Sequence, residues 1–157
     1  MKRITAIISL IAVILTLGAC SGKSVDINSL KENMIKADNT LPDMKTVTNE
    51  DEKPDTLFAS MSDMDYSKID SFFLCYSSDG SPYEIAAVTV KDKGDIKALE
   101  ESLNDHIKNR IQLYRNYAPE NVDKAEKAIV LTNDATAALI MCDKRDEVKK
   151  AFENAFK

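Results

Sequence analysis

The sequence contains few of the residues on which metal, phosphate and nucleophilic chemistry usually depend. Its 157 residues include one histidine, four glycines and three cysteines. A single histidine, His106, cannot complete a typical zinc site, and no nearby cysteine or serine forms an evident nucleophile pair with it. Four scattered glycines leave no Gly-rich phosphate loop. We therefore predict no bound metal, no cofactor and no catalytic residue.

Two of the three cysteines lie well inside the chain. Cys75 and Cys142 occur in apolar, strand-like runs, FFLCYS and ALIMC, with no CxxC spacing and no histidine nearby to indicate zinc. An exported location would permit a disulfide between them, whereas buried free cysteines pack as small apolar side chains. The sequence does not set the Cα separation that a disulfide requires. Both interpretations of this cysteine pair therefore stay open.

The third cysteine, Cys20, follows a segment with the build of a secretory signal. Two basic residues precede an apolar run of about 14 residues that ends in Gly18 and Ala19. A spanning helix needs about 20 apolar residues, so this run is too short to cross a bilayer permanently. The segment LGAC resembles the lipobox of bacterial lipoproteins, in which the cysteine thiol takes a diacylglyceryl group and the chain is cut before it. The resemblance implies a signal peptide at 1–19 and a lipid anchor on Cys20; an ordinary cleaved signal beside a chance cysteine is the alternative.

Charge limits the partners of the remaining chain. Removal of residues 1–19 would leave 138 residues, with 19 of the 21 Lys and Arg residues, all 26 Asp and Glu residues, and a net charge of about −7. An acidic domain lacks the electrostatic surface that binds nucleic acid, and an anionic membrane would weakly repel it. We therefore expect no nucleic-acid partner and attachment to the membrane through lipid alone, since two acyl chains anchor a protein stably.

Apolar periodicity predicts a single α+β domain over residues 25–157, joined to Cys20 by a short polar tether at 20–24. A first helix is expected after Asp26, a candidate N-cap, and the order strand, strand, helix then occurs twice. Two such units predict an antiparallel four-stranded sheet with its helices on one face. The second face would need a cover from the N-terminal segment, the membrane side or a partner.

Turn residues and apolar spacing locate these units. The first hairpin turns at DGSP (79–82) between an aromatic run and an alternating run, and the second turns at residues 133–134. After Gly94, apolar residues recur at gaps of three or four for about six helical turns. A C-terminal helix with one apolar stripe is expected to begin at Asp143 as its N-cap.

Acidic clusters raise the question of a calcium site. The most charged segment, NEDEKPD at 49–55, and the group Asp63, Asp65 and Asp70 lack the spacing and the glycine of a calcium loop. We therefore interpret both acidic clusters as solvated loops rather than as calcium sites.

Paired carboxylates raise the question of a hydrolase. Glu100 with Glu101, or Glu84 with Asp92, would serve a glycosidase-like mechanism only if folding brought two carboxyl groups to about 5–9 Å in a cleft. Nothing in their spacing predicts this, and the polar face of a helix accounts for the first pair.

Aromatic residues concentrate on the first hairpin, at Phe72, Phe73, Tyr76 and Tyr83. Since strand side chains alternate, Phe72 and Phe73 must face opposite sides of the sheet. One side is core. The other would be either a surface platform for a peptide, glycan or protein, or a surface packed under the N-terminal helix, and we favour the packed arrangement.

Four stretches carry a resemblance to a known family: TLPDM at 40–44, YEIAAVTVKD at 83–92, YAPENVDKAEKAIVLT at 117–132 and AFENAF at 151–156. They resemble small lipoproteins of Gram-positive bacteria that share a domain of unknown function, and the similarity covers nearly all of the expected domain. This resemblance implies the fold and an extracytoplasmic, membrane-anchored location, and adds no catalytic residue. Family members tend to have Gly, any residue, then Tyr at the second hairpin turn, where this chain has NDATA, so a ligand contact at that tip is not implied here.

These features favour a non-enzymatic lipoprotein on the extracytoplasmic face of the cell membrane, anchored at Cys20, that binds an envelope protein or a small ligand. A carboxylate-dependent hydrolase of the cell envelope is the alternative, and it would need a cleft that holds two carboxyl groups with raised pKa values. An accessory subunit is a third hypothesis, which a large exposed apolar patch would indicate.

Overall fold

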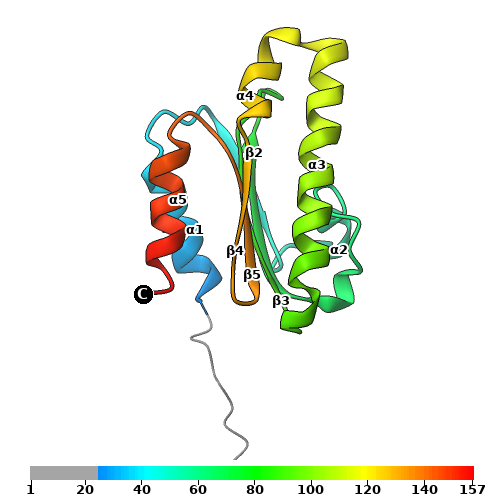
Figure 1. Cartoon of the computed structure of the whole chain (residues 1–157), viewed down its shortest axis with the longest axis vertical. Coiled ribbons are helices and arrows are strands. Elements are labelled where there is room, and N and C mark those ends of the chain that lie inside the picture. Colours follow the sequence, from blue (N-terminus) through cyan, green and yellow to red (C-terminus); the bar gives the residue numbers. More distant parts are fainter. Residues whose placement is uncertain (1–24) are drawn as a thin grey trace, which may run out of the picture.

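The protein is described by a computed structural model over residues 25–157, in which five strands form one antiparallel sheet (Figure 1). The predicted signal peptide, tether and lipid anchor fall on residues 1–24, outside the described residues. The strands are β1 (Met44–Thr48), β2 (Ile69–Ser77), β3 (Glu84–Val90), β4 (Ile129–Asn133) and β5 (Thr136–Met141), in the sheet order β1-β2-β3-β5-β4. The α-helices are α1 (Ile27–Ala37), α2 (Pro54–Phe58), α3 (Ile96–Tyr117), α4 (Val122–Glu126) and α5 (Arg145–Asn154), with short 3-10 turns η1 (Tyr66–Lys68), η2 (Lys93–Asp95) and η3 (Pro119–Asn121).

Both predicted hairpins are confirmed. Strand β2 pairs with β3 and β4 pairs with β5, antiparallel in each case, and β3 pairs with β5 to join the two hairpins. Gly80 in the first turn has φ 80° and Asp134 in the second has φ 54°. Both lie in the left-handed region, which glycine adopts freely and Asp tolerates better than most residues. The turn residues thus explain where the chain reverses.

The sheet has one strand more than the four that the sequence predicts. Strand β1 pairs antiparallel with β2 at the edge of the sheet, with Val47 opposite Leu74. Its five residues, MKTVT, carry only a short alternation, and the strand forms because β2 offers a free row of backbone hydrogen-bonding groups beside it. The correction to five strands matters for function, since Val47 lines the pocket described below.

Both faces of the sheet are buried. Phe72, Leu74, Ala86 and other alternate residues pack in one core against α3, whereas Phe73, Ile85, Ile140 and their neighbours pack in a second core with α1 and α5. Phe73 is only 1% exposed. The aromatic hairpin is therefore packed on both sides, as favoured above, and Phe73 belongs to no surface platform.

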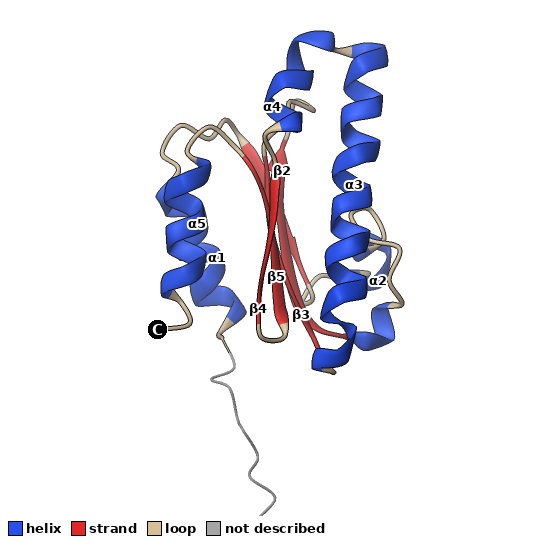
Figure 2. Cartoon of the chain, in the orientation of Figure 1, coloured by secondary structure: helices blue, strands red, loops and turns tan. Residues whose placement is uncertain are grey.

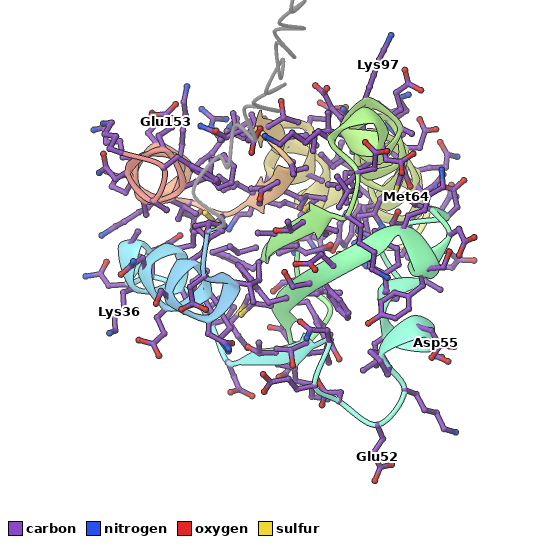
Figure 3. The ribbon with its side chains drawn as sticks, turned by 90° about the horizontal axis from the view of Figure 1, so that it is seen from below. Lys36, Glu52, Asp55, Met64, Lys97 and Glu153 are labelled. Carbon is purple, nitrogen blue, oxygen red and sulfur yellow. The ribbon has the colours of Figure 1, made fainter. Side chains whose placement is uncertain are left out.

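The helices lie on both faces, which corrects the prediction that they share one. Figure 2 shows α1 and α5 as one layer and α3 with α2 and α4 as the other, and the view from below in Figure 3 shows α1 beside α5. The N-terminal segment is one of the covers considered from sequence, and here α1 shares that task with α5. Asp26 caps α1 as predicted, because its carboxylate accepts a hydrogen bond from the Ser29 N–H at 2.9 Å.

The predicted long helix is confirmed, whereas the predicted start of the last helix at Asp143 is wrong. Helix α3 has 22 residues, about six turns. Helix α5 begins at Arg145, and its N-cap residue is Lys144, which makes no side-chain capping bond. Asp143, expected as the cap, instead accepts a hydrogen bond from Tyr83 and pairs with Lys124.

The α1 layer should contribute to the stability of the whole domain. Leu30 is fully buried against the second core, so Leu30→Ala should lower the free energy of unfolding by about 2–5 kcal/mol, measured by urea denaturation. Asn33→Ala, on the exposed side of the same helix, is the control and should change it by about 0.5 kcal/mol or less. Equal stability of the two variants would contradict a structural role for α1.

Candidate functional site

A pocket of about 300 Å³ opens on the α3 side of the sheet. Strands β1 and β2 form one wall, α2 another, and the middle of α3 a third. Its lining is apolar along Val47, Leu57, Leu74 and Tyr76, with three ionisable side chains added. The lining residues are Val47, Thr56, Leu57, Ser60, Leu74, Tyr76, Glu84, His106 and Arg110. Apolar walls with a few convergent polar groups are typical of small-molecule sites.

Glu84 is the buried charge of this pocket. It is the first residue of β3 and alternates with Ala86 and Val88, so its side chain points to the α3 side. In the sheet it lies between Tyr76 of β2 and Met141 of β5, and the residue is 3% exposed. A carboxylate so deeply buried is rare unless other groups compensate its charge.

Helix α3 supplies the compensating groups. His106 and Arg110 are four residues apart and therefore share one side of the helix. The His106 Nε2 atom lies 2.8 Å from Glu84 Oε1, and the Arg110 Nε atom lies 3.8 Å from Glu84 Oε2. None of the three atoms Glu84 Oε1, His106 Nε2 and Arg110 Nε has an aligned hydrogen bond within the described residues. The three side chains are therefore in close polar contact, although these atoms lack an aligned hydrogen bond.

Tyr114 holds Arg110 from the other side. The Arg110 Nη2 group donates a hydrogen bond to the Tyr114 hydroxyl, and the guanidinium carbon lies 4.9 Å from the ring centroid. The hydroxyl in turn donates to the Gly80 carbonyl at 3.1 Å, which ties α3 to the first hairpin turn. Burial raises the pKa of Tyr114, so the hydroxyl remains a donor. This chain of contacts fixes the guanidinium beside Glu84.

A second, smaller pocket of about 180 Å³ is also lined by His106 and contains serines. Ser102, one turn before His106, donates its hydroxyl to the Asp63 carboxylate at 2.6 Å and lies 2.8 Å from the Ser62 hydroxyl. Asp63, one of the acidic residues considered for calcium, is thus bound to the start of α3. Within residues 25–157, the His106 Nε2 atom forms no hydrogen bond with a hydroxyl or thiol.

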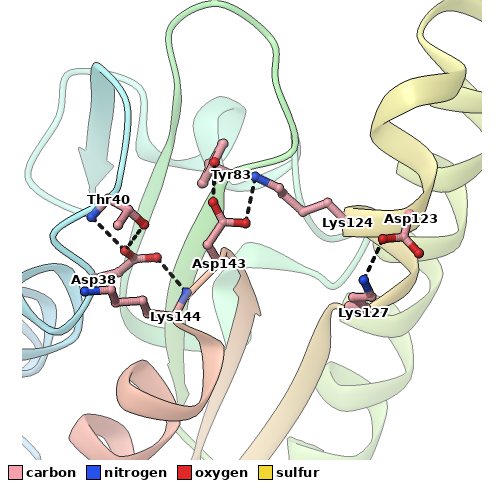
Figure 4. Close-up of polar contacts among 8 residues, drawn as sticks. All are labelled: Asp38, Thr40, Tyr83, Asp123, Lys124, Lys127, Asp143 and Lys144. Carbon is pink, nitrogen blue, oxygen red and sulfur yellow. Dashed lines mark hydrogen bonds and ion pairs between the residues drawn. The ribbon is translucent and has the colours of Figure 1, made fainter.

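A third hollow, between α4 and the start of α5, is lined by charged groups that are paired with one another (Figure 4). Asp143 accepts a hydrogen bond from the Tyr83 hydroxyl at 2.6 Å and lies 2.9 Å from Lys124 Nζ. Hydrogen bonds from Tyr83 and Lys124 lower the pKa of Asp143. Lys124 also lies 3.6 Å from the centre of the Tyr83 ring, a cation–π contact. These paired groups hold neighbouring segments of the fold together.

The two cysteines whose bonding the sequence leaves open are not bonded to one another. Cys75 and Cys142 are both free and buried. Strand β3 lies between β2 and β5, and two strand spacings amount to about 10 Å, beyond the Cα separation of about 7 Å that a disulfide spans. Burial raises the pKa of both thiols, and the nearby Asp38 carboxylate raises that of Cys142 further. Both cysteines act as small apolar core residues.

The carboxylate pairs considered from the sequence do not form a two-carboxylate cleft. Glu84 begins β3 and Asp92 lies two residues beyond its end, so the length of the strand, about 20 Å at 3.3 Å per residue, separates them. Glu100 and Glu101 are on α3 and line none of the pockets described here, and the main pocket contains Glu84 as its only carboxylate. Among residues 25–157, no three His, Cys, Asp or Glu side chains gather as a metal site would require.

The trio of Glu84, His106 and Arg110 is the site that sequence reasoning missed. In the sequence, Glu84 stands out only as a possible partner of Asp92, and His106 only as a lone histidine on a helix. A polar residue within the otherwise apolar run EIAAV and a His and Arg one helical turn apart are the available signals. They become informative only when β3 is known to pack under α3.

Comparison with known proteins gives one match. A family model described as a domain of unknown function (DUF4358) matches residues 43–142, which include the whole sheet and every residue of the main pocket. No curated protein and no solved structure matches the chain. None of the helices in the described part, 25–157, is both long and apolar enough to cross a membrane.

Asp38 should make the fold sensitive to acid. It follows α1 and accepts hydrogen bonds from the Thr40 N–H at 2.9 Å and the Lys144 N–H at 3.0 Å, which joins α1 to α5 (Figure 4). Burial opposes its charge, yet these bonds prevail and lower its pKa. A lowered folded-state pKa stabilises the fold above the unfolded pKa of about 3.9, and that stability is lost as pH falls through the lower folded value.

We therefore expect Asp38→Asn to lower the free energy of unfolding at pH 7 by about 1–3 kcal/mol and to weaken its decline below about pH 4, as measured by urea denaturation across pH. Asp43→Asn, at an exposed residue, is the control. An unchanged pH profile in the Asp38 variant would show that the carboxylate does not join the helices.

Proposed function

The chain belongs to the family defined by the domain of unknown function DUF4358, and we propose that it is a membrane-anchored extracytoplasmic lipoprotein that binds a small ligand and catalyses no reaction. The observation that carries the binding function is the pocket on the α3 side of the sheet. Its apolar walls adjoin the buried Glu84 carboxylate and the partly buried His106 and Arg110 side chains. Protein folding by itself gives little reason to bury such a set, because burying an ion pair is often neutral or costly for stability.

Binding is favoured over hydrolysis by the chemistry around the pocket. A glycosidase-like mechanism needs two carboxyl groups, and this pocket contains one. A general acid needs a raised pKa, whereas the shifted carboxyl groups of the described chain, Asp26, Asp38, Asp65, Asp79 and Asp143, all have lowered values. These observations support a binding module and give the hydrolase alternative no specific support.

The anchor proposal is based on the sequence. The lipobox-like segment before Cys20 and the resemblance to lipoproteins of Gram-positive bacteria support lipidation of that cysteine. The described domain begins at Val25, so residues 20–24 would form a tether of at most about 17 Å. A tether this short would keep the binding domain close to the outer face of the cell membrane.

Cys20→Ala tests the anchor. The variant should lose incorporation of an alkyne-labelled fatty acid and should either be released or remain uncleaved, as seen by fractionation and by the mass of the chain. Cys75→Ala is the matched control, because its thiol is buried in the domain, and it should stay labelled in the membrane fraction. Unchanged labelling and membrane retention of Cys20→Ala would contradict the proposal.

Filling the pocket tests the binding function. Val47 lines the pocket, and Val47→Phe should abolish most hits from a small-molecule library screened by ligand-observed NMR against the full chain. Thr46→Phe is the control, since Thr46 is the exposed neighbour on β1 and faces the other side of the sheet. A library without hits, or hits that bind both variants equally, would remove the support for a ligand site here.

A further inference from the structure

Cys75 and Cys142 are the two cysteines of the described chain, and the fold keeps their thiols apart. Both belong to the core beneath α1 and α5. Cys75 on β2 lies opposite Ile85 of β3, and Ile85 lies opposite Ile140 of β5, two residues before Cys142. Two strand spacings, about 10 Å, therefore separate the cysteines, in addition to the offset along the chain. A disulfide needs a Cα separation of at most about 7 Å.

No small movement of the folded domain brings these two thiols together. Strand β3 is hydrogen-bonded to β2 on one side and to β5 on the other. Its residues 85–88 are fully buried between the two cores. Strand β3 would have to leave the centre of the sheet before Cys75 reached Cys142, and both cores would open with it. The native fold and a disulfide between these cysteines therefore exclude one another.

The unfolded chain lacks this restriction. The entropic cost of closing a loop rises only slowly with its length, so the long segment between the cysteines permits their contact. Their thiols would then be solvated, with the ordinary cysteine pKa of about 8.5. In the folded domain, burial raises the pKa of both thiols, which leaves little of the reactive thiolate. Oxidation therefore acts on the unfolded chain rather than on the folded domain.

We propose that Cys75 and Cys142 form a redox-sensitive switch of folding: a disulfide between them in the unfolded chain prevents this fold, and its reduction restores folding. Two S–H bonds break and one S–S bond forms, while two electrons and two protons pass to an oxidising disulfide, which becomes two thiols. The extracytoplasmic location proposed above would expose the chain to oxidants of this class. The inference goes beyond the proposed function, since it concerns how the domain reaches its fold rather than what it binds.

The full-length Cys20→Ala chain in a nonionic detergent tests the switch, because Cys75 and Cys142 are then its only cysteines. The chain is unfolded in urea, treated at low protein concentration with diamide, whose N=N bond takes up the two hydrogen atoms, and diluted from urea. The mass after alkylation should show that a monomer has lost both thiols, and the cooperative thermal unfolding transition should be absent. Dithiothreitol should restore the transition, and an untreated sample should refold directly.

Two controls separate the disulfide from other effects of the oxidant. Diamide added to the folded chain should leave both thiols free and the thermal transition unchanged. Cys75→Ala and Cys142→Ala, each in the same background, cannot form the disulfide, and their monomers should refold after diamide treatment. The same variants without diamide show that the substitution itself permits folding.

Several outcomes would overturn the switch. One is a monomeric chain that carries the disulfide and still refolds to the same transition. Another is an unfolded chain in which diamide forms no disulfide between the two cysteines. Loss of refolding in both single-cysteine variants would also overturn it, because the oxidant itself would then be the cause. None of these measurements involves a ligand or a lipid, so a negative result leaves the proposed function standing.

Discussion

Burial of strands β2, β3 and β5 on both faces is the constraint on which the rest of the structure depends. Their apolar side chains divide into two cores, one on each side of the sheet. An antiparallel sheet can leave one face in water only if that face is polar, which is not so here. The fold therefore needs two helical layers, and the layer of α1 and α5 is as necessary as the layer of α3. The strong effect expected at Leu30 follows from this requirement.

Glu84 is the one ionisable side chain that breaks this apolar pattern within β3. It lies at the start of the strand, where α3 passes over the sheet and where the Tyr114 hydroxyl binds the Gly80 carbonyl. A polar network is stabilising when every member is satisfied and costly when some are not. The unmade bonds among Glu84, His106 and Arg110 thus set this place apart from the paired groups around Asp143, where Tyr83 and Lys124 complete the contacts. The same physical criterion separates a candidate site from a structural cluster.

Sequence patterns predict the elements of this protein better than their arrangement. The period of α3, the turns at Gly80 and Asp134 and the cap at Asp26 are local signals, and the structure agrees with them. An apolar stripe tells that a helix packs on a sheet but not on which face, so it does not reveal that α5 and α3 lie on opposite faces. Strand β1 depends on its partner β2, and the contact between Glu84 and His106 depends on how β3 and α3 pack. Neither is encoded in local periodicity.

The residue range of the family match separates the two helical layers, because it includes α3 and excludes α1 and α5. Residues 43–142 contain the sheet, α3 and the whole pocket, whereas α1 and α5 lie outside the match. The second core still requires both helices, so segments that flank the matched domain complete its fold. Helix α1 is also the element that follows the proposed anchor most closely in the chain. A lipid on Cys20 would therefore be attached to the layer that covers the sheet, and the pocket would lie on the opposite side of the sheet from that attachment.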